Sequence, residues 1–354
     1  MTAKLDEGRA VRAGEELDAA AVDRWLKTQV PELLGTPRVT QFSGGAPNWT
    51  YRLQYENRDL ILRRPPSGTK AKSAHDMARE HRVQSALQPV FAAVPMMVAL
   101  CQDPAILGVD FYVMDRIAGV IPRKEMPKGL GLDDQQTRTL CEGVVDKLVE
   151  LHRVDAKAIG LDSLGRGAGY PRRQIEGWSD RFDKARTWNV HGFGSTRKWL
   201  LANIPDDAGQ CVIHNDWRLD NLVLDAANPT KIIGVLDWEL STVGDPLMDL
   251  GCALAYWVEA GDPLLLRMLR RQPTHVPGML RRKEVIARYF QKSGRTPTSF
   301  TFYEVYGLFR LAVIAQQISY RYHHKQTRNP AFRQFWLFVN YLSWRCSRIL
   351  GERG

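Results

Sequence analysis

The chain has 354 residues, 44% hydrophobic and 25% charged, which is an ordinary globular balance with length enough for a two-lobed enzyme. Its net charge of +10 is compatible with nucleic-acid binding. However, the sequence contains no zinc-finger or RNP-type motif and no basic stripe interleaved with aromatic residues. We therefore interpret the densest basic stretch, Arg267–Arg295, as solvated helix faces. No apolar run reaches the roughly 20 residues that span a bilayer, and Met1–Leu17 lacks the apolar core of a signal peptide, so no membrane attachment is expected.

The first third of the chain predicts a helix followed by a small antiparallel sheet. Asp18 is placed to cap a short helix that runs through Val30. Residues 74–88 have the spacing of a second helix, carried by Met77, His81, Val83 and Leu87. The predicted strands, bounded by turn-rich segments, are Val39–Phe42, Thr50–Tyr55, Leu60–Arg63, Val94–Leu100 and Phe111–Met114.

The pattern changes at Asp133, from where helical periodicity dominates. Short β-runs interrupt it at Val212-Ile213, Leu222–Leu224 and Ile232–Leu236. Long amphipathic stretches follow at 281–291, 302–322 and 331–350. This order predicts an α+β protein with a small antiparallel β lobe, a hinge near Met114–Gly119 and a larger helical lobe.

Three polar side chains lie at the ends of short apolar strands between residues 211 and 239. One strand leads into His214-Asn-Asp216, Asn221 opens the next strand, and the third strand ends on Asp237. Transfer of a γ-phosphoryl group needs an acid that accepts the hydroxyl proton, hard oxygen ligands for Mg²⁺ and a cation on the phosphates. We expect Asp216, Asn221 and Asp237 to meet at one edge of a small hairpin.

These residues carry a family resemblance. The run HxDxxxxN, then Asp237 in Leu-Asp-Trp-Glu, then Gly244-Asp-Pro-x-x-Asp249 resembles the aminoglycoside phosphotransferase and choline kinase-like superfamily, which shares the protein-kinase fold. The resemblance covers nearly the whole chain and implies an ATP- and Mg²⁺-dependent phosphotransferase acting on a hydroxyl of a small molecule. It divides the chain into an N-terminal tail and helix (1–36), a small nucleotide-binding lobe (37–116) and a large catalytic and substrate-binding lobe (117–354).

The resemblance also implies roles for individual residues. Asp216 corresponds to the catalytic base, and Asn221 and Asp237 to the Mg²⁺ ligands. Arg63 takes the place of the phosphate-pairing lysine, with Glu80 as its ion-pair partner. His214 and Asp249 are expected to hold the loop by hydrogen bonds.

Two segments would hold the nucleotide. In the loop Ser43–Asn48 the phosphate contacts expected are Gly44, Gly45, Ala46 and Asn48, because Pro47 offers neither a hydroxyl nor an N–H. Arg64 is an alternative to Arg63, but side chains alternate along a strand, so only one of the two faces the phosphates. The adenine edge is expected at Met114, Asp115, Arg116 and Ile117.

The acceptor is the least determined part. A basic chain suits an anionic acceptor better than a polycationic aminoglycoside, and the residues expected near the acceptor are Arg173, Arg218, Arg310, Trp178, Trp217 and Trp257. Segments such as Leu62-Arg-Arg-Pro-Pro and Phe309-Arg-Leu-Ala-Val-Ile resemble the kinase domains associated with acyl-CoA dehydrogenases, which favours a hydroxyacyl-CoA thioester.

Several alternatives stay open. They are an aminoglycoside or other small-alcohol kinase, a catalytically weak nucleotide-binding module, and a nucleic-acid-associated protein. Five cysteines without a CxxC pair are typical of reduced thiols in a cytoplasmic protein. The oligomeric state is not predicted.

Overall fold

The computed structural model describes residues 5–42, 48–66, 76–206 and 209–351. Their contacts group the chain into two compact units. The first unit takes its described residues from Met1–Lys147, Lys157–Leu161 and Leu219–Ser241. The second takes them from Leu148–Ala156, Asp162–Arg218 and Thr242–Gly354. The division at 36/37 and 116/117 that the sequence suggests stays a prediction.

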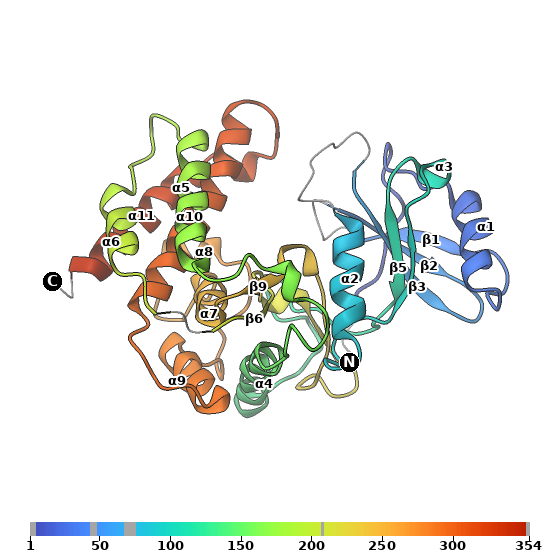
Figure 1. Ribbon diagram of the computed structural model, residues 1–354, viewed down its shortest axis with the longest axis horizontal. Helices are drawn as coiled ribbons and strands as arrows, with labels where there is room; N and C mark the ends of the chain where they lie inside the picture. The colour runs from blue at the N-terminus through green and yellow to red at the C-terminus, as the bar shows by residue number, and fades with distance from the viewer. Residues whose placement is uncertain (1–4, 43–47, 67–75, 207–208, 352–354) are drawn as a thin grey trace. The chain divides into compact units, whose positions relative to one another are not determined.

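The first unit is built on a five-stranded antiparallel sheet with the order β1-β2-β3-β5-β4 (Figure 1). Its strands are β1 (Arg38–Gln41), β2 (Trp49–Gln54), β3 (Asp59–Arg64), β4 (Met97–Cys101) and β5 (Phe111–Asp115). Each coincides with a predicted strand, although β4 begins three residues later than expected. A two-stranded hairpin of β7 (Leu222–Leu224) and β8 (Ile232–Val235) belongs to the same unit.

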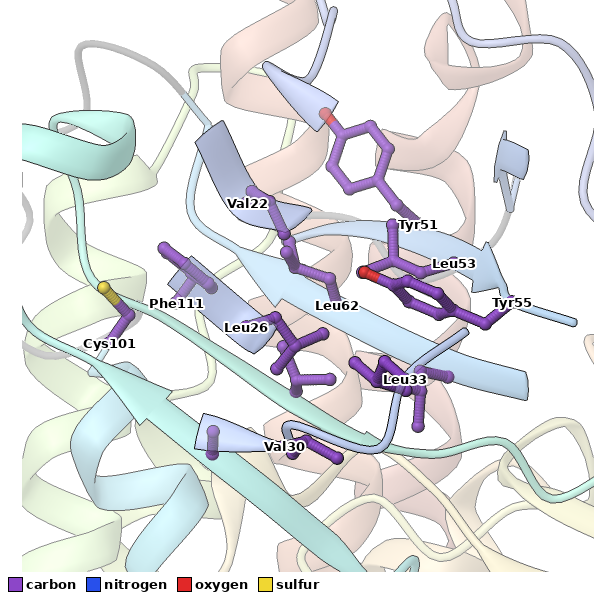
Figure 2. Close-up of a cluster of buried hydrophobic side chains, with 13 residues drawn as sticks. Val22, Leu26, Val30, Leu33, Tyr51, Leu53, Tyr55, Leu62, Cys101 and Phe111 are labelled. Atoms are coloured by element: carbon purple, nitrogen blue, oxygen red, sulfur yellow. The ribbon is translucent and has the colours of Figure 1, made fainter. Parts of the chain in front are cut away.

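Helices cover both faces of this sheet. Helix α1 (Ala19–Gln29) begins at Asp18, whose carboxylate accepts a hydrogen bond from the Ala21 N–H at 2.9 Å. Its fully buried Val22 and Leu26 pack with residues of the sheet such as Leu62 (Figure 2). Helix α2 (Met77–Leu87) packs against β4 and β5 (Figure 1). The short α3 (Pro104–Leu107) and the first part of α4 (Asp134–His152) complete the unit.

The second unit is helical around one small sheet. Its helices are α5 (Tyr170–Ala185), α6 (Gly194–Ala202), α7 (Pro246–Ala255), α8 (Leu264–Leu269), α9 (Arg282–Ser293), α10 (Thr301–His323) and α11 (Phe335–Gly351). Helix α10 packs against α5, α7 and α11. It meets α7 at two glycines, because a Cβ on Gly307 would lie 2.2 Å from the Gly251 carbonyl oxygen.

The small sheet corrects one expectation. Strand β6 (Cys211–Ile213) pairs with β9 (Thr242–Gly244), which the sequence did not predict. Val212 lies opposite Val243 in this apolar pairing, so β6 is not a strand of the hairpin that β7 and β8 form. That hairpin therefore consists of β7 and β8, and Asp216 does not follow one of its strands.

Two further expectations concern the whole chain. All five cysteines are free and buried, as predicted. Within the described part of the chain, every helix is too short or too polar to cross a membrane.

Candidate functional site

Arg63 and Arg64 point to opposite faces of the five-stranded sheet. Arg64 lies on the face that α1 covers, where its guanidinium stacks over Trp49 and donates a 3.2 Å hydrogen bond to the Tyr51 hydroxyl. Arg63 lies on the α2 face, opposite Tyr112 of β5. The alternation of a strand thus separates the two arginines, and Arg63 is the one that faces α2.

Arg63 is surrounded by three carboxylates of the first unit, which together with it we call the Arg63 cluster. Its guanidinium donates a hydrogen bond to Asp237 at 3.1 Å and lies 3.7 Å from Glu80 and 3.9 Å from Glu239. Asn48, itself buried, donates to Glu80 at 3.2 Å and to Glu239 at 3.1 Å. The cluster therefore joins β3, α2 and the segment after β8.

Burial sets the electrostatics of this cluster. Burial alone would lower the pKa of Arg63, but attraction to Tyr112 and to the carboxylates raises it well above the ordinary value. Burial raises the pKa of Glu80, against the opposing effects of Arg63 and of a 2.9 Å hydrogen bond from the Tyr112 hydroxyl. Three acids share one permanent cation, so the cluster keeps an excess of negative charge when all three are ionised.

The two predicted metal ligands lie side by side at the end of the β7–β8 hairpin. The Leu236 N–H donates to the Asn221 carbonyl oxygen at 2.8 Å, which places Asn221 beside the residue that precedes Asp237. Asp237 adopts the left-handed conformation, with φ 69°, which a short polar side chain tolerates. An amide and a carboxylate are hard oxygen donors, so their chemistry fits Mg²⁺. Among the described residues, no group of three or more His, Cys, Asp or Glu side chains is arranged to hold a metal.

Asp216 belongs to the second unit, in the loop that follows β6. Asp249 of α7, which is fully buried, holds this loop through hydrogen bonds. The Asp249 carboxylate accepts hydrogen bonds from the backbone N–H groups of His214 and Asn215, both at 2.8 Å, and from the His152 ring at 3.1 Å. Burial would raise the pKa of Asp249, but its bonds to His152 and its attraction to His214 lower it below the ordinary value.

Two arginines approach the same loop from other elements. Arg218 donates to the Asp216 carboxylate at 2.9 Å, and its guanidinium stacks over the Tyr256 ring at 5.0 Å. Arg310 of α10 is buried and donates to the Asn215 carbonyl oxygen at 2.8 Å. The backbone and the carboxylate of this loop are therefore both fixed by cationic side chains.

The remaining predicted residues are placed as follows. Met114 packs in a buried cluster with Ile61 and Met77. The side chains of Asp115 and Arg116 form ion pairs with Arg58 and Asp59. Ile117 packs over Gly234, where a Cβ would lie 2.7 Å from its Cδ1. Gly44, Gly45 and Ala46 lie outside the described residues.

The residues proposed for an acceptor separate into two groups. Arg310 stacks over Trp178 at 5.2 Å, and Arg218 contacts Asp216. Arg173 instead donates to the Gly167 carbonyl oxygen at 2.7 Å, while Trp257 is buried and donates to the Leu280 carbonyl oxygen. Trp217 is also buried, with its ring against His214.

Sequence reasoning missed Glu239, Tyr112 and His152. Glu239 stands two residues after Asp237, and that short spacing is a signal that could have indicated a shared cluster. Tyr112 lies opposite Arg63 only because β5 pairs with β3, and His152 reaches Asp249 only through the packing of α4. Neither contact has a local signature.

Comparisons with known proteins give the family. The model of the phosphotransferase enzyme family matches residues 38–285. The chain is 33% identical over 319 residues to acyl-CoA dehydrogenase family member 10 of Mus musculus, covering 88% of this chain and 29% of that protein. It is 32% identical over 317 residues to family member 11 of Rattus norvegicus, covering 87% and 40%. The chain therefore spans less than half the length of these curated relatives.

Solved structures of similar fold include aminoglycoside phosphotransferases and a choline kinase. A crystal structure from Ralstonia eutropha, provisionally assigned as an aminoglycoside phosphotransferase, has a TM-score of 0.81 and 26% identity, covering 95% of this chain and 99% of that one. A ternary complex of an aminoglycoside phosphotransferase with AMP-PNP and hygromycin B has a TM-score of 0.57 and 13% identity, covering 95% and 99%. Choline kinase from Cryptosporidium parvum has a TM-score of 0.57 and 12% identity, covering 94% of this chain and 97% of that one. At such low identity, the ternary complex and the choline kinase show only that this chain has the same fold. The predicted kinase-like α+β fold is confirmed.

Proposed function

Because the chain belongs to the phosphotransferase enzyme family, we propose that it transfers the γ-phosphoryl group of ATP to a hydroxyl of a small molecule, with Mg²⁺. The observation that carries the proposal is the Arg63 cluster. A buried guanidinium that contacts both Glu80 and Asp237 is suited to pair with phosphate oxygens next to a metal ligand.

The residues divide the work as follows. Asp216 accepts the proton of the acceptor hydroxyl while that oxygen bonds to the γ-phosphorus and the bond to the β-phosphate oxygen breaks. Arg218 keeps the Asp216 carboxylate in one orientation through its 2.9 Å contact. Asn221 and Asp237 hold Mg²⁺, which neutralises charge on the phosphates when bound. The backbone of Met114–Ile117 receives the adenine.

We propose a hydroxyacyl thioester of coenzyme A as the acceptor. Two observations support it: the relatives named as acyl-CoA dehydrogenase family members, and the net charge of +10, which favours a polyanion over a polycation. An aminoglycoside or a choline-like alcohol is the second candidate, favoured by the names of the solved neighbours.

The test is a screen for ATP consumption with hydroxyacyl-CoA thioesters, aminoglycosides and choline-like alcohols. The wild type should consume ATP with at least one of these acceptors. Asp216→Ala should abolish transfer and keep ATP binding, whereas Asp237→Ala should remove Mg²⁺-dependent nucleotide binding. Asp180→Ala, on an exposed position of α5, is the matched control and should behave as the wild type.

Two outcomes would count against the proposal. If the wild type binds ATP but consumes none with any acceptor, the protein is a nucleotide-binding module. If Asp216→Ala transfers phosphate at nearly the wild-type rate, the base is a different residue.

A further inference from the structure

A cavity of about 660 Å³ lies at the C-terminal end of α10, within the second unit. Its wall is formed by Thr187 and Asn189 after α5, by Ser319 and Tyr322 of α10, by the segment that joins α10 to α11, and by Trp336 of α11. This volume is within the range of small-molecule sites in proteins. We call it the basic cavity because lysine and arginine side chains line it.

The charged side chains that line the basic cavity are all positive. The joining segment contributes Lys325, Arg328 and Arg333, and none of the described residues that line the cavity is acidic. These three side chains are exposed, and across the described ranges none of them forms an ion pair with a carboxylate. Like charges gathered around a concave surface create a potential that concentrates anions.

The part of the wall formed by Thr187 and Asn189 is held in place by hydrogen bonds from α10 and α11. Gln316 of α10, which is fully buried, donates to the Ala185 carbonyl oxygen at 2.7 Å and to the Thr187 hydroxyl at 3.1 Å. Asn340 of α11 donates to the Asn189 carbonyl oxygen at 3.0 Å. The polar groups of Thr187 and Asn189 are therefore preorganised before any ligand binds.

Helix α10 links the basic cavity to the loop of Asp216. Arg310 binds the carbonyl oxygen of Asn215, the residue before Asp216. Ser319 lies nine residues further along the same helix, a rise of roughly 14 Å. Nine residues are about 2.5 turns, so Ser319 lies on the side of α10 opposite Arg310. An elongated molecule with its hydroxyl at Asp216 must therefore pass around α10 as well as along it to place its other end in the cavity.

We propose that the basic cavity binds a phosphate-bearing ligand with an aromatic base. Lys325, Arg328 and Arg333 bind the phosphate oxygens, for which the planar arginine forks are suited. Tyr322 and Trp336 contact the ring of the base. Resting on the proposed function, we assign this ligand as the end of the acceptor that is remote from the phosphorylated hydroxyl.

The first experiment measures equilibrium binding of adenosine 3′,5′-bisphosphate by calorimetry, with ATP and Mg²⁺ present at saturation so that the nucleotide site is occupied. The wild type should bind the probe, more weakly as ionic strength rises. Arg328→Glu with Arg333→Glu should weaken binding at least tenfold. Arg267→Glu with Arg271→Glu, two exposed arginines outside the cavity, is the charge-matched control and should change it little.

No binding by the wild type, or equal weakening in the control, would overturn the site. The measurement needs no turnover, so it stands or fails independently of the phosphotransferase proposal. Trp336→Leu keeps the charges and should weaken the adenosine probe while leaving inorganic phosphate unaffected. Equal binding of both probes by this variant and the wild type would overturn the contact with the base.

The second experiment separates an acceptor from a free nucleotide. With an acceptor that carries the nucleotide, the double variant should raise KM at least tenfold and keep kcat, whereas KM for a truncated acceptor without the nucleotide should not change. An unchanged KM for both acceptors, with probe binding still lost, would support the phosphate site and overturn its assignment to the acceptor.

Discussion

The Arg63 guanidinium donates to the Asp237 carboxylate at 3.1 Å, although the two residues are 174 positions apart in the chain. One is a strand residue of the five-stranded sheet, and the other follows β8 of the hairpin. Because Asp237 is also the proposed metal ligand, its carboxylate must be shared between Arg63 and Mg²⁺ when nucleotide binds. The contact therefore connects the proposed phosphate-binding cation to the proposed metal ligand.

Replacing Arg63 by lysine should weaken nucleotide binding, whereas the same replacement of the neighbouring Arg64 should not. Lysine keeps the charge but loses the fork that reaches Asp237, Glu80 and Glu239 together, so binding of ATP with Mg²⁺ should weaken about tenfold or more. Arg64→Lys, on the opposite face of β3, should leave nucleotide affinity unchanged. Calorimetric titration of both variants measures the difference.

Removing the charge at this position should also cost stability. Arg63→Ala leaves three carboxylates without their cation in a buried site, a change of about 3–5 kcal/mol in the free energy of unfolding. Urea denaturation measures this. Arg63→Ala as stable as the wild type would show that the carboxylates are not paired in solution.

The stability of the second unit should depend on pH through Asp249. The pKa of this carboxyl is lowered in the folded protein, so the unfolded chain binds its proton at a higher pH. Its contribution is therefore complete above the ordinary value of 3.8 and is lost as the pH falls toward the folded value. Asp249→Asn should remove it together with hydrogen bonds to the loop, a loss of about 3 kcal/mol at neutral pH.

Unfolding of the wild type and Asp249→Asn should be compared at several pH values from about 7 down to about 3. The difference in stability between the two proteins should shrink toward the acid end. A difference that is constant across this range would mean that folding does not lower the pKa of Asp249.

Local patterns predicted much of the site. Strand alternation separates Arg63 from Arg64, and an N-cap aspartate with an apolar face gives α1. The bonds from Asp249 to the loop amides followed from the spacing of the resemblance. The first two signals lie within a few residues of sequence, whereas the third comes from the family resemblance, because Asp249 is 35 positions from His214.

Contacts between distant segments could not be predicted in this way. Strand β9 has three residues and gains its structure from pairing with β6. Glu239 joins the Arg63 cluster, and Asn48 links two of its carboxylates, only through tertiary packing. Such contacts depend on register and helix placement, which a single sequence does not encode locally.

Arg218 is expected to act on catalysis without affecting ATP binding. Its contact with Asp216 orients the proposed base, and both residues belong to the second unit. Arg218→Ala should lower kcat with the acceptor found in the screen at least tenfold, while Arg218→Lys recovers part of it and nucleotide affinity stays constant. Arg172→Ala, an exposed arginine of α5, should retain wild-type kcat. Equal kcat for Arg218→Ala and the wild type would exclude this role.

The meeting of α7 and α10 at Gly251 and Gly307 should tolerate no side chain. A Cβ on Gly307 would lie 2.2 Å from the Gly251 carbonyl oxygen, and a Cβ on Gly251 would lie 2.3 Å from the Tyr303 carbonyl oxygen. Both obstacles are backbone atoms, so the helices themselves must separate. Helix α7 carries Asp249 and α10 carries Arg310, so a separation also moves the two groups that hold the Asp216 loop.

Gly307→Ala should therefore lower the free energy of unfolding by about 2 kcal/mol or more, even though alanine is the better helix former. Gly143→Ala in α4 is the control, because its Cβ would meet no atom closer than 3.8 Å. That variant should be as stable as the wild type or about 1 kcal/mol more stable. Urea denaturation of the two variants gives opposite signs if the crossing is as close as described, and equal stabilities would show that α10 lies further from α7.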